Sequence, residues 1–282
     1  MSHESNKRWS IKPSSSLLDL KISETIDYRD LLWLFVRRDF VSFYKQTVLG
    51  PLWFFIQPIF TVLIYTLIFG SVAGISTDGI PKPLFYLAGV VTWNYFSDCL
   101  LKTSTVFRDN APIFGKVYFP RLIMPLSIIF SNMVRFAVQL LLFFMLMGYY
   151  FIKGEHFHLT SFVLLFPILI ILMALLGLGL GMIVSALTTK YRDLAFLVTF
   201  GVPLLMYTTT VVYPLSAAPV HFKWLIELNP LTAIIECFRL GFLGSGTITL
   251  GTLGYSIGFT IIVLVLGIII FNKVEKNFVD TV

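Results

Sequence analysis

Four long stretches without a charged side chain constrain this chain more than any other feature. They are Val48–Thr77, Leu159–Thr189, Leu194–Val220 and Leu240–Asn272. Each is longer than the roughly 20 residues that cross a lipid bilayer as an α-helix. A segment inside lipid must satisfy its own backbone hydrogen bonds, so these stretches are expected to be helical. With 57% hydrophobic and only 13% charged residues, the sequence predicts an all-α integral membrane protein and argues against a soluble domain.

Two further apolar segments, Pro83–Leu101 and Leu122–Ile152, raise the expected number of membrane spans to six. Both contain ionisable residues but are long enough to cross a bilayer. The polar residues 1–27 are predicted to form a mobile cytoplasmic arm, and residues 273–282 a cytoplasmic tail. Between them we expect one transmembrane domain, residues 28–272. Its predicted spans are residues 51–70, 83–102, 121–150, 161–187, 194–213 and 250–271.

The Lys and Arg residues are distributed unevenly between the segments outside the spans. Fifteen lie in the first fifty residues, in segments 108–121 and 190–192, and in the tail, against four in the segments of the opposite side. Cytoplasmic segments carry the excess of cations in membrane proteins, so both termini are predicted to be cytoplasmic. This topology accounts for the net charge of +6, and no nucleic-acid partner is expected.

An amphipathic pattern precedes the first span. Within residues 28–46, Leu32, Val36 and Phe40 fall on one helical face, with cations on the other. This pattern is typical of a helix in the membrane interface, with its apolar side chains at the acyl boundary. Gly50-Pro51 disfavours a continuous helix, so we expect a hinge before the first span. The alternative is that the helix simply extends that span.

Residues 108–120 connect the second and third spans on the cytoplasmic side. The segment is charged at both ends and apolar in the middle. Exposed aromatic side chains such as Phe114 and Tyr118 need something to cover them. We therefore predict a short amphipathic helix that docks another protein, with a plain connecting loop as the alternative.

Two ionisable residues fall inside predicted spans. Asp98 is expected about one helical turn from the cytoplasmic end of the second span, where it can pair with Lys102 four residues later. Arg135 is expected about 20 Å from the inner end of the third span, too deep for Asp98 to be its obvious partner. An arginine at that depth must face protein or a water-filled path, so Arg135 is predicted to line a transport path.

Residues 220–243 are too polar for another span and too long for a simple loop. Pro219 and Pro230 divide the region into two short helices. Such a pair can re-enter the outer leaflet only where protein or water satisfies the freed backbone groups. Glu236 and Arg239 are three residues apart and are expected to pair.

Several kinds of chemistry have no motif in the sequence. There is no GxxxxGK[ST] phosphate loop, no Cys/His cluster for a metal and no GxSxG nucleophile motif. The residues therefore predict neither a metal site nor a cofactor in this chain, and no enzymatic activity of its own. If the chain transports a substrate, the energy is expected to come from another subunit.

Four segments resemble, in this order and spacing, the permease subunit of ABC-2 type polysaccharide exporters. These exporters carry lipid-linked O-antigen, capsule or teichoic acid. The segments are RRDFVSFYKQTVLGPLWFFIQP at Arg37–Pro58, NAPIFGKVYFPR at Asn110–Arg121, KYRDL at Lys190–Leu194, and YPLSAAP…LNPLTAIIECFR at Tyr213–Arg239.

The resemblance implies a homodimer in the bacterial inner membrane with two ATP-binding cassette ATPase subunits, which bind ATP and Mg. Residues 28–46 would be an interface helix among membrane lipids, 108–120 a coupling helix on the ATPase, and 220–243 outer re-entrant gate helices. The channel would form between the protomers, chiefly from the first and fifth spans. The coupling residues would be Arg108, Asp109, Asn110, Phe114 and Tyr118, and the outer gate residues Glu227, Glu236 and Arg239.

A lipid-linked glycan would reach the chain at the interface helix. Arg37, Arg38 and Lys45 are the candidates for attracting its pyrophosphate, although anchoring on anionic lipid explains each of them equally well. Aromatic faces let sugar rings slide, and the channel candidates are Trp53, Phe54, Tyr65, Arg135 and Tyr207.

Three other functions are alternatives for a chain of this kind. An ABC-2 permease for a drug or another lipid is the nearest rival. A membrane-embedded glycosyl or acyl transferase would need clustered Asp, Glu or His near one face, and the sequence has no such cluster. A membrane scaffold would need neither Arg135 within a span nor a broken pair of outer helices.

Overall fold

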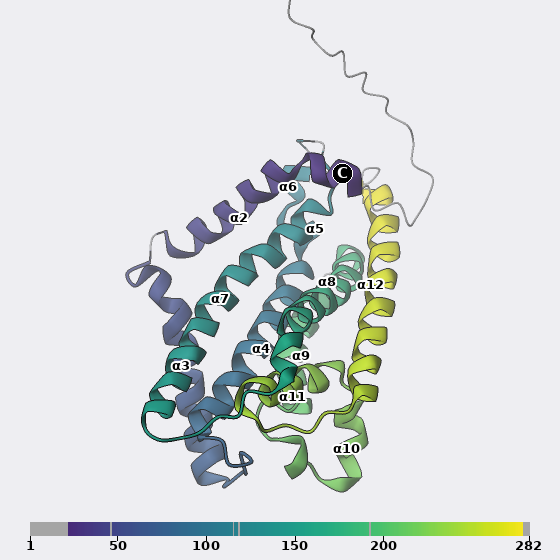
Figure 1. Cartoon of the computed structure of the whole chain (residues 1–282). Helices are drawn as coiled ribbons and strands as arrows, with labels where there is room; N and C mark the ends of the chain where they lie inside the picture. The colour runs from purple at the N-terminus through teal and green to yellow at the C-terminus, as the bar shows by residue number, and fades with distance from the viewer. Residues whose placement is uncertain (1–21, 46, 115, 118, 192, 279–282) are drawn as a thin grey trace, which may run out of the picture.

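The computed structural model describes residues 22–45, 47–114, 116–117, 119–191 and 193–278 (Figure 1). Tyr118 and most of the predicted arm, residues 1–21, lie outside these ranges, as do the last four residues of the predicted tail. Across the described ranges the secondary structure is helical and contains no strand. The predicted all-α class is therefore confirmed.

The helices follow one another as an apolar bundle with short connecting segments. The amino-terminal half contains α1 (Ile22–Asp27), α2 (Arg29–Tyr44), η1 (Gly50–Leu52), α3 (Trp53–Tyr65), η2 (Thr66–Val72), α4 (Lys82–Thr103), α5 (Val106–Asp109), α6 (Ala111–Phe114) and α7 (Ile123–Ile152). The carboxy-terminal half contains η3 (Ser161–Leu165), α8 (Phe166–Lys190), α9 (Leu194–Leu205), η4 (Met206–Thr208), η5 (Leu215–Ala217), α10 (Val220–Glu227), α11 (Pro230–Leu243) and α12 (Leu250–Phe278).

In the part of the chain that the structure describes, four helical segments are long and apolar enough to cross a membrane. They are Gly50–Val72, Ile123–Ile152, Ser161–Lys190 and Leu250–Val274. The segment Leu194–Thr208 is apolar but shorter. Helix α4 has 22 residues, and at 1.5 Å per residue it measures about 33 Å. Polar residues lower its hydropathy, and it is buried along most of its length against α7 and α8.

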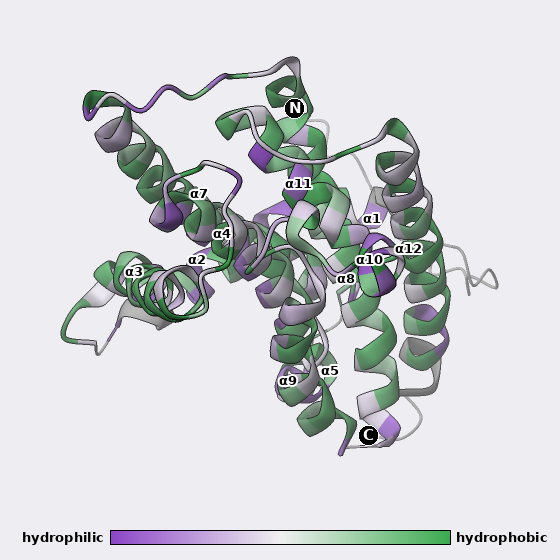
Figure 2. Cartoon of the chain, turned by 90° about the horizontal axis from the view of Figure 1, so that it is seen from below, coloured by the Kyte–Doolittle hydropathy of each residue, from purple (hydrophilic) through white to green (hydrophobic). Residues whose placement is uncertain are grey.

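The two ends of the bundle are formed by different helices. Helices α2, α5 and α6 lie at the same end as the last turns of α12, and α10 and α11 lie at the opposite end (Figure 1). Seen along the bundle in Figure 2, α4 and α8 lie near the centre and α3 stands at one edge. Hydrophobic residues cover the outward faces of α3 and α12. This is the distribution expected of helices that face lipid or another membrane subunit.

Glycine allows close approach between the central helices. A Cβ atom on Gly177 would lie 2.8 Å from Cys99 Cβ, and one on Gly181 would lie 2.5 Å from Thr103 Cβ. Both glycines therefore face α4. Small residues four apart on a membrane helix are a common basis for such contacts. They set the distance between α8 and the helix that carries the polar residues described below.

The break before the first span is as predicted. Helix α2 ends at Tyr44 and α3 begins at Trp53, with Gly50 between them at a φ of +52°. Residues with a Cβ rarely adopt that conformation. Since α2 and α3 are separate helices, the alternative of one continuous extension of the first span is wrong.

The apolar face of α2 is covered differently from the prediction. Leu32 and Val36 were expected at the acyl boundary, but both are buried within the chain, where α2 contacts α7. Trp33 and Leu34 are instead the exposed apolar side chains, 59% and 61% accessible. A position of α2 at the membrane surface stays a prediction, and on this geometry Trp33 and Leu34 would meet the lipid.

Candidate functional site

A row of polar contacts joins α4 to α7 along their antiparallel faces. Asn94 Nδ2 donates to Gln139 Oε1 at 3.4 Å, the Asp98 carboxylate lies 3.6 Å from the Arg135 guanidinium, and Lys102 Nζ donates to Asn132 Oδ1 at 2.9 Å. Polar groups in a membrane-spanning bundle are costly unless they find such partners. The row therefore satisfies the charged residues predicted within the second and third spans.

The pairing of Arg135 with Asp98 corrects the prediction that they lie too far apart. That estimate treated the two helices as starting at one level. In the structure Lys102, one residue before the end of α4, contacts Asn132, the tenth residue of α7. The part of α7 that precedes Asn132 measures about 13 Å at 1.5 Å per residue. The start of α7 therefore lies about 13 Å beyond the level of Lys102 and Asn132. Arg135 lies one turn further along and reaches Asp98.

Arg135 also contacts the first span. Its guanidinium carbon lies 5.3 Å from the centre of the Phe54 ring, within the range of a cation–π contact. The Phe54 side chain is buried, and its ring is 6.1 Å from that of Phe40 in α2. Trp53 is 42% exposed. Phe54 is therefore placed between α2 and α7 rather than on an open surface of this chain.

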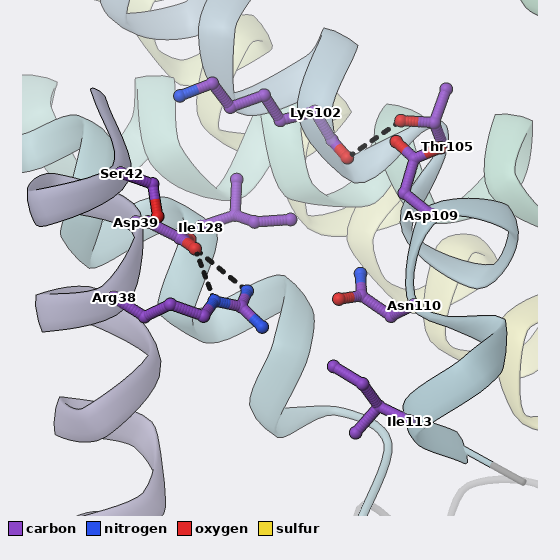
Figure 3. A pocket seen from close by; sticks show the side chains of 9 residues that line it. All are labelled: Arg38, Asp39, Ser42, Lys102, Thr105, Asp109, Asn110, Ile113 and Ile128. Atoms are coloured by element: carbon purple, nitrogen blue, oxygen red, sulfur yellow. Dashed lines mark hydrogen bonds and ion pairs between the residues drawn. The ribbon is translucent and has the colours of Figure 1, made fainter. Parts of the chain in front are cut away.

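A pocket of about 530 Å³ opens between α2, the end of α4, α5–α6 and α7 (Figure 3). Charged and hydroxyl-bearing side chains dominate its lining. The lining residues are Arg38, Asp39, Ser42, Lys102, Thr105, Asp109, Asn110, Ile113 and Ile128. It brings the predicted headgroup helix, α2, and the predicted coupling segment together at one site.

The cations predicted to attract a pyrophosphate do not form one group. Arg38 lines the pocket, where it pairs with Asp39 at 2.8 Å. Arg37 and Lys45 are exposed and are not part of the lining. Lys102, considered in the sequence only as a partner of Asp98, is the additional cation at this site. The sequence signal that could have found it is its place at the inner end of a predicted span.

The predicted coupling helix is not continuous. Residues 108–120 contain parts of two four-residue helices, α5 and α6. Pro112 has no backbone N–H and so cannot donate one of the hydrogen bonds that would continue a helix through Asn110. The Asn110 side chain instead donates to the Val106 carbonyl at 3.0 Å. The predicted single helix is therefore wrong at this point.

The side chains of this segment divide between solvent and the chain itself. Arg108 pairs with Asp109 at 2.9 Å, and both are more than half exposed. Phe114 packs on Phe119, with ring centres 5.6 Å apart, and Phe119 is buried. Much of the aromatic surface predicted to dock a partner is therefore covered internally, whereas the charged pair remains available.

Two predicted channel residues, Tyr65 and Tyr207, belong to one aromatic cluster. The Phe69 ring lies 5.5 Å from that of Tyr65 and 6.5 Å from that of Tyr207. Tyr86 of α4 completes the cluster, 6.2 Å from Tyr65. Tyr207 is 47% exposed. The cluster joins α3, η2, α4 and η4, and its members Phe69 and Tyr86 were not anticipated from the sequence.

Glu236 and Arg239 form the expected ion pair, at 3.4 Å, but both side chains are buried. Arg239 donates to the carbonyls of Thr210 and Val211, and its guanidinium carbon lies 3.6 Å from the centre of the Phe85 ring. These two residues come after the end of η4, where the helix no longer supplies hydrogen-bond donors to the carbonyl oxygens. The Arg239 guanidinium supplies those donors instead. Both side chains of the pair are buried within this chain, whereas Glu227 is partly exposed.

Residues 30–243, from α2 to the end of α11, match the family model described as ABC-2 type transporter. The chain belongs to the ABC-2 type transporter family. The match includes the polar α4–α7 row, the pocket and the buried Glu236–Arg239 pair.

Relatives of this ABC-2 chain have been named for glycan export. The O-antigen export system permease protein RfbA of Klebsiella pneumoniae is 30% identical over 269 residues, covering 93% of this chain and 99% of the relative. RfbA of Myxococcus xanthus is 28% identical, covering 77% and 82%. The polysialic acid transport protein KpsM of Escherichia coli is 24% identical, covering 81% and 87%. The resemblance inferred from four short segments is confirmed.

Proposed function

We propose that this chain is the membrane permease of an exporter for a lipid-linked, O-antigen-like polysaccharide in the bacterial inner membrane. The observation that carries the proposal is the similarity to an O-antigen export permease along 93% of the chain and 99% of the relative. On this proposal the chain is a transport subunit and not an enzyme. Separate ATPase subunits hydrolyse ATP and hold its Mg.

Six spans and cytoplasmic termini are part of this proposal. The four apolar helical segments supply four spans, and buried α4 and the shorter segment Leu194–Thr208 supply the others. The shared end of α2, α5 and the last turns of α12 agrees with the excess of cations on that side (Figure 1). The pair α10–α11 at the opposite end would re-enter the outer leaflet.

A second copy of the chain would complete the channel. The outward faces of α3 and α9 carry large exposed apolar side chains, among them Phe60, Leu63, Phe196 and Phe200. Exposed apolar surface of this extent needs lipid or a second subunit to cover it. Trp53 and Tyr65 lie on α3, and Tyr207 lies on η4, which follows α9 directly. The exposed Tyr207 ring offers a face over which sugar rings can slide.

Coupling to the ATPase would involve the α5–α6 corner. Arg108 and Asp109 are exposed there, and Asn110 and Phe114 follow directly. Tyr118 is included in this proposal from its place in the sequence, because it lies outside the described residues. Movement of this corner would be transmitted to the last turn of α4, because Lys102 lines the same pocket as Asp109 and Asn110.

The decisive experiment is depletion of this chain in the cell that encodes it. Lipid-linked glycan is then expected to accumulate on the cytoplasmic side while surface glycan falls. A matched control inactivates the ATPase partner by substitution of its phosphate-loop lysine and should give the same phenotype. Unchanged surface glycan would favour a permease for a drug or another lipid. Loss of glycan synthesis itself would favour the transferase alternative.

A further inference from the structure

A second pocket, of about 310 Å³, opens between α10 and the first turns of α12. Its lining residues are Trp224, Glu227, Leu228, Gly251, Thr252 and Tyr255. Helix α10 lies at the end of the bundle opposite α2 (Figure 1), and α10 and α12 lie on the other side of the bundle from α3 (Figure 2). The pocket is therefore separate from the cavity beside α2 and from the face of α3 proposed to meet a second copy.

Two hydroxyl groups of α12 fix the end of α10 against this pocket. The Tyr255 hydroxyl donates to the Leu228 carbonyl at 2.9 Å, and Ser256 Oγ donates to the Pro230 carbonyl at 2.9 Å. Ser256 is buried, whereas Tyr255 is 39% exposed. Because its hydroxyl is bonded to the backbone of the neighbouring helix, the Tyr255 ring forms a fixed wall of the pocket.

The Glu227 carboxylate is the charged group of this lining. In the part of the chain that the structure describes, no ion pair or side-chain hydrogen bond includes it. The pocket combines this carboxylate with the rings of Trp224 and Tyr255. Aromatic faces attract a cation, and a carboxylate accepts strong hydrogen bonds from a charged N–H group. The set is therefore suited to an ammonium ligand.

Large apolar side chains surround the pocket on the surface. Val220, Phe222 and Leu225 of α10 and Leu250 at the start of α12 are between 48% and 85% exposed. On the proposed topology this end faces the outer leaflet, where aromatic side chains such as Trp224 gather at the level of the lipid headgroups. The surroundings therefore place the ammonium ligand among membrane lipids.

We propose that the α10–α12 pocket binds the headgroup of a phosphatidylethanolamine molecule of the outer leaflet. Its ammonium group would donate to Glu227 and contact the rings of Trp224 and Tyr255. Its phosphate would lie toward Lys223, which is one helical turn before Glu227 on the same face of α10. The inference rests on the proposed topology and not on the identity of the exported substrate.

The chemistry of the pocket distinguishes this lipid from others. Phosphatidylcholine has an equally charged headgroup but no N–H to donate to Glu227. Phosphatidylglycerol is anionic, and the carboxylate repels it. The volume of about 310 Å³ lies within the roughly 300–1,000 Å³ of small-molecule sites and suits a compact headgroup.

A bound lipid would supply an attachment that α10 otherwise lacks. Ile226 is the buried residue of this helix. It belongs to a small cluster with Leu215 and Ala218 that is separate from the main core. A headgroup held between α10 and α12 is therefore expected to slow the local opening of α10, because few buried apolar contacts do so in its absence.

The test uses the full-length chain, co-purified with its ATPase subunits in detergent and titrated with dioleoyl phosphatidylethanolamine. Native mass spectrometry counts the bound lipid. One molecule per chain should bind more tightly than the phosphatidylcholine or phosphatidylglycerol of the same acyl chains. Glu227→Gln should weaken this binding roughly 10-fold, because a charge-assisted hydrogen bond is lost. Trp224→Leu should weaken it about threefold through the lost cation–π contact.

The matched control is Glu155→Gln, which removes an exposed carboxylate from the segment between α7 and η3 and should bind the lipid as the parent does. Size-exclusion profiles in detergent without added lipid should be the same for the parent and every variant, which shows that each is folded. As a second readout, phosphatidylethanolamine should slow amide hydrogen exchange in α10 of the parent and not of Glu227→Gln.

Four results would overturn the inference. Equal binding of phosphatidylcholine or phosphatidylglycerol would show an unselective lipid surface. Parental binding by Glu227→Gln, or the same loss in Glu155→Gln, would remove the carboxylate from the site. Unchanged exchange in α10 on lipid binding would place the lipid elsewhere. Displacement of the lipid by purified surface polysaccharide would assign the pocket to the exported glycan. Each result is independent of the depletion experiment, so the proposed function can stand while this inference fails.

Discussion

The Asp98 carboxylate and the Arg135 guanidinium lie 3.6 Å apart across the contact of α4 and α7. Neither side chain is fully buried, with accessibilities of 37% and 19%. Arg135 simultaneously covers the ring of Phe54 at the start of the first span. This one arginine therefore connects α3, α4 and α7, next to the level at which α2 meets α3. Its contacts are those of a residue that positions helices.

Removing one member of this pair is expected to destabilise the protein more than neutralising both. Arg135→Gln leaves the Asp98 carboxylate without its guanidinium partner, which should cost about 1–3 kcal/mol, and Asp98→Asn is the matching single variant on the other side of the pair. The double variant Asp98→Asn, Arg135→Gln keeps neutral polar groups at both positions and should recover part of that loss. Thermal unfolding of the single and double variants in detergent measures the coupling. Strictly additive effects, within about 0.5 kcal/mol, would mean that the two side chains do not stabilise each other.

The positions of the helices could be predicted because their signals are local. Uninterrupted apolar stretches give the spans, and Gly50-Pro51 gives the break before α3. The register between helices has no such local signal. Arg135 and Asp98 were judged too far apart because the sequence does not show that α7 begins well beyond the end of α4. For the same reason, Lys102 could not be recognised as part of a pocket with Arg38.

Periodicity also leaves open what covers an apolar face. Leu32 and Val36 share a face of α2, but only the structure shows that α7 covers it and that Trp33 is the exposed aromatic. The same limit applies to Arg239. Its pairing with Glu236 follows from their spacing, whereas the carbonyls of Thr210 and Val211 become its partners only because the chain leaves helical geometry after η4.

Arg239 is expected to be among the least replaceable residues of the fold. Arg239→Met leaves the Glu236 carboxylate and two backbone carbonyls buried without this partner, and removing one member of a buried pair costs about 3–5 kcal/mol. Arg239→Lys should rescue poorly, because an ammonium cannot reproduce the planar guanidinium fork. The measurement is the monodisperse fraction in fluorescence-detected size-exclusion chromatography. Glu227→Gln, at a partly exposed position, is the control and should behave as the parent. A monodisperse Arg239→Met protein would contradict this account.

The close contact of α8 with α4 makes a third, purely steric prediction. A methyl group on Gly181 would lie 2.5 Å from Thr103 Cβ, whereas one on Gly148 meets nothing within 4 Å. Gly181→Ala should therefore lower the midpoint of thermal unfolding by an amount corresponding to about 1–3 kcal/mol. Gly148→Ala, also within a long helix, should leave the midpoint unchanged or raise it slightly. If both variants unfold alike, α4 and α8 do not approach as closely as described.

The aromatic cluster offers the most direct test of the glycan path. Tyr207 exposes 47% of its surface and contacts Phe69 at the junction of the first and fifth spans. If its ring face carries the passing sugars, Tyr207→Ala should lower the rate at which glycan appears at the cell surface, whereas Tyr207→Phe should retain most of it. Aromatic contacts contribute about 0.5–1.5 kcal/mol each, which corresponds to a reduction of roughly 2- to 10-fold. The assay is a time course of surface glycan at matched permease levels, with Tyr149→Ala, at an exposed position near the end of α7, as the control. Equal export by Tyr207→Ala and the control would remove Tyr207 from the path, because a residue that only packs against Phe69 should affect protein level and not the rate per molecule.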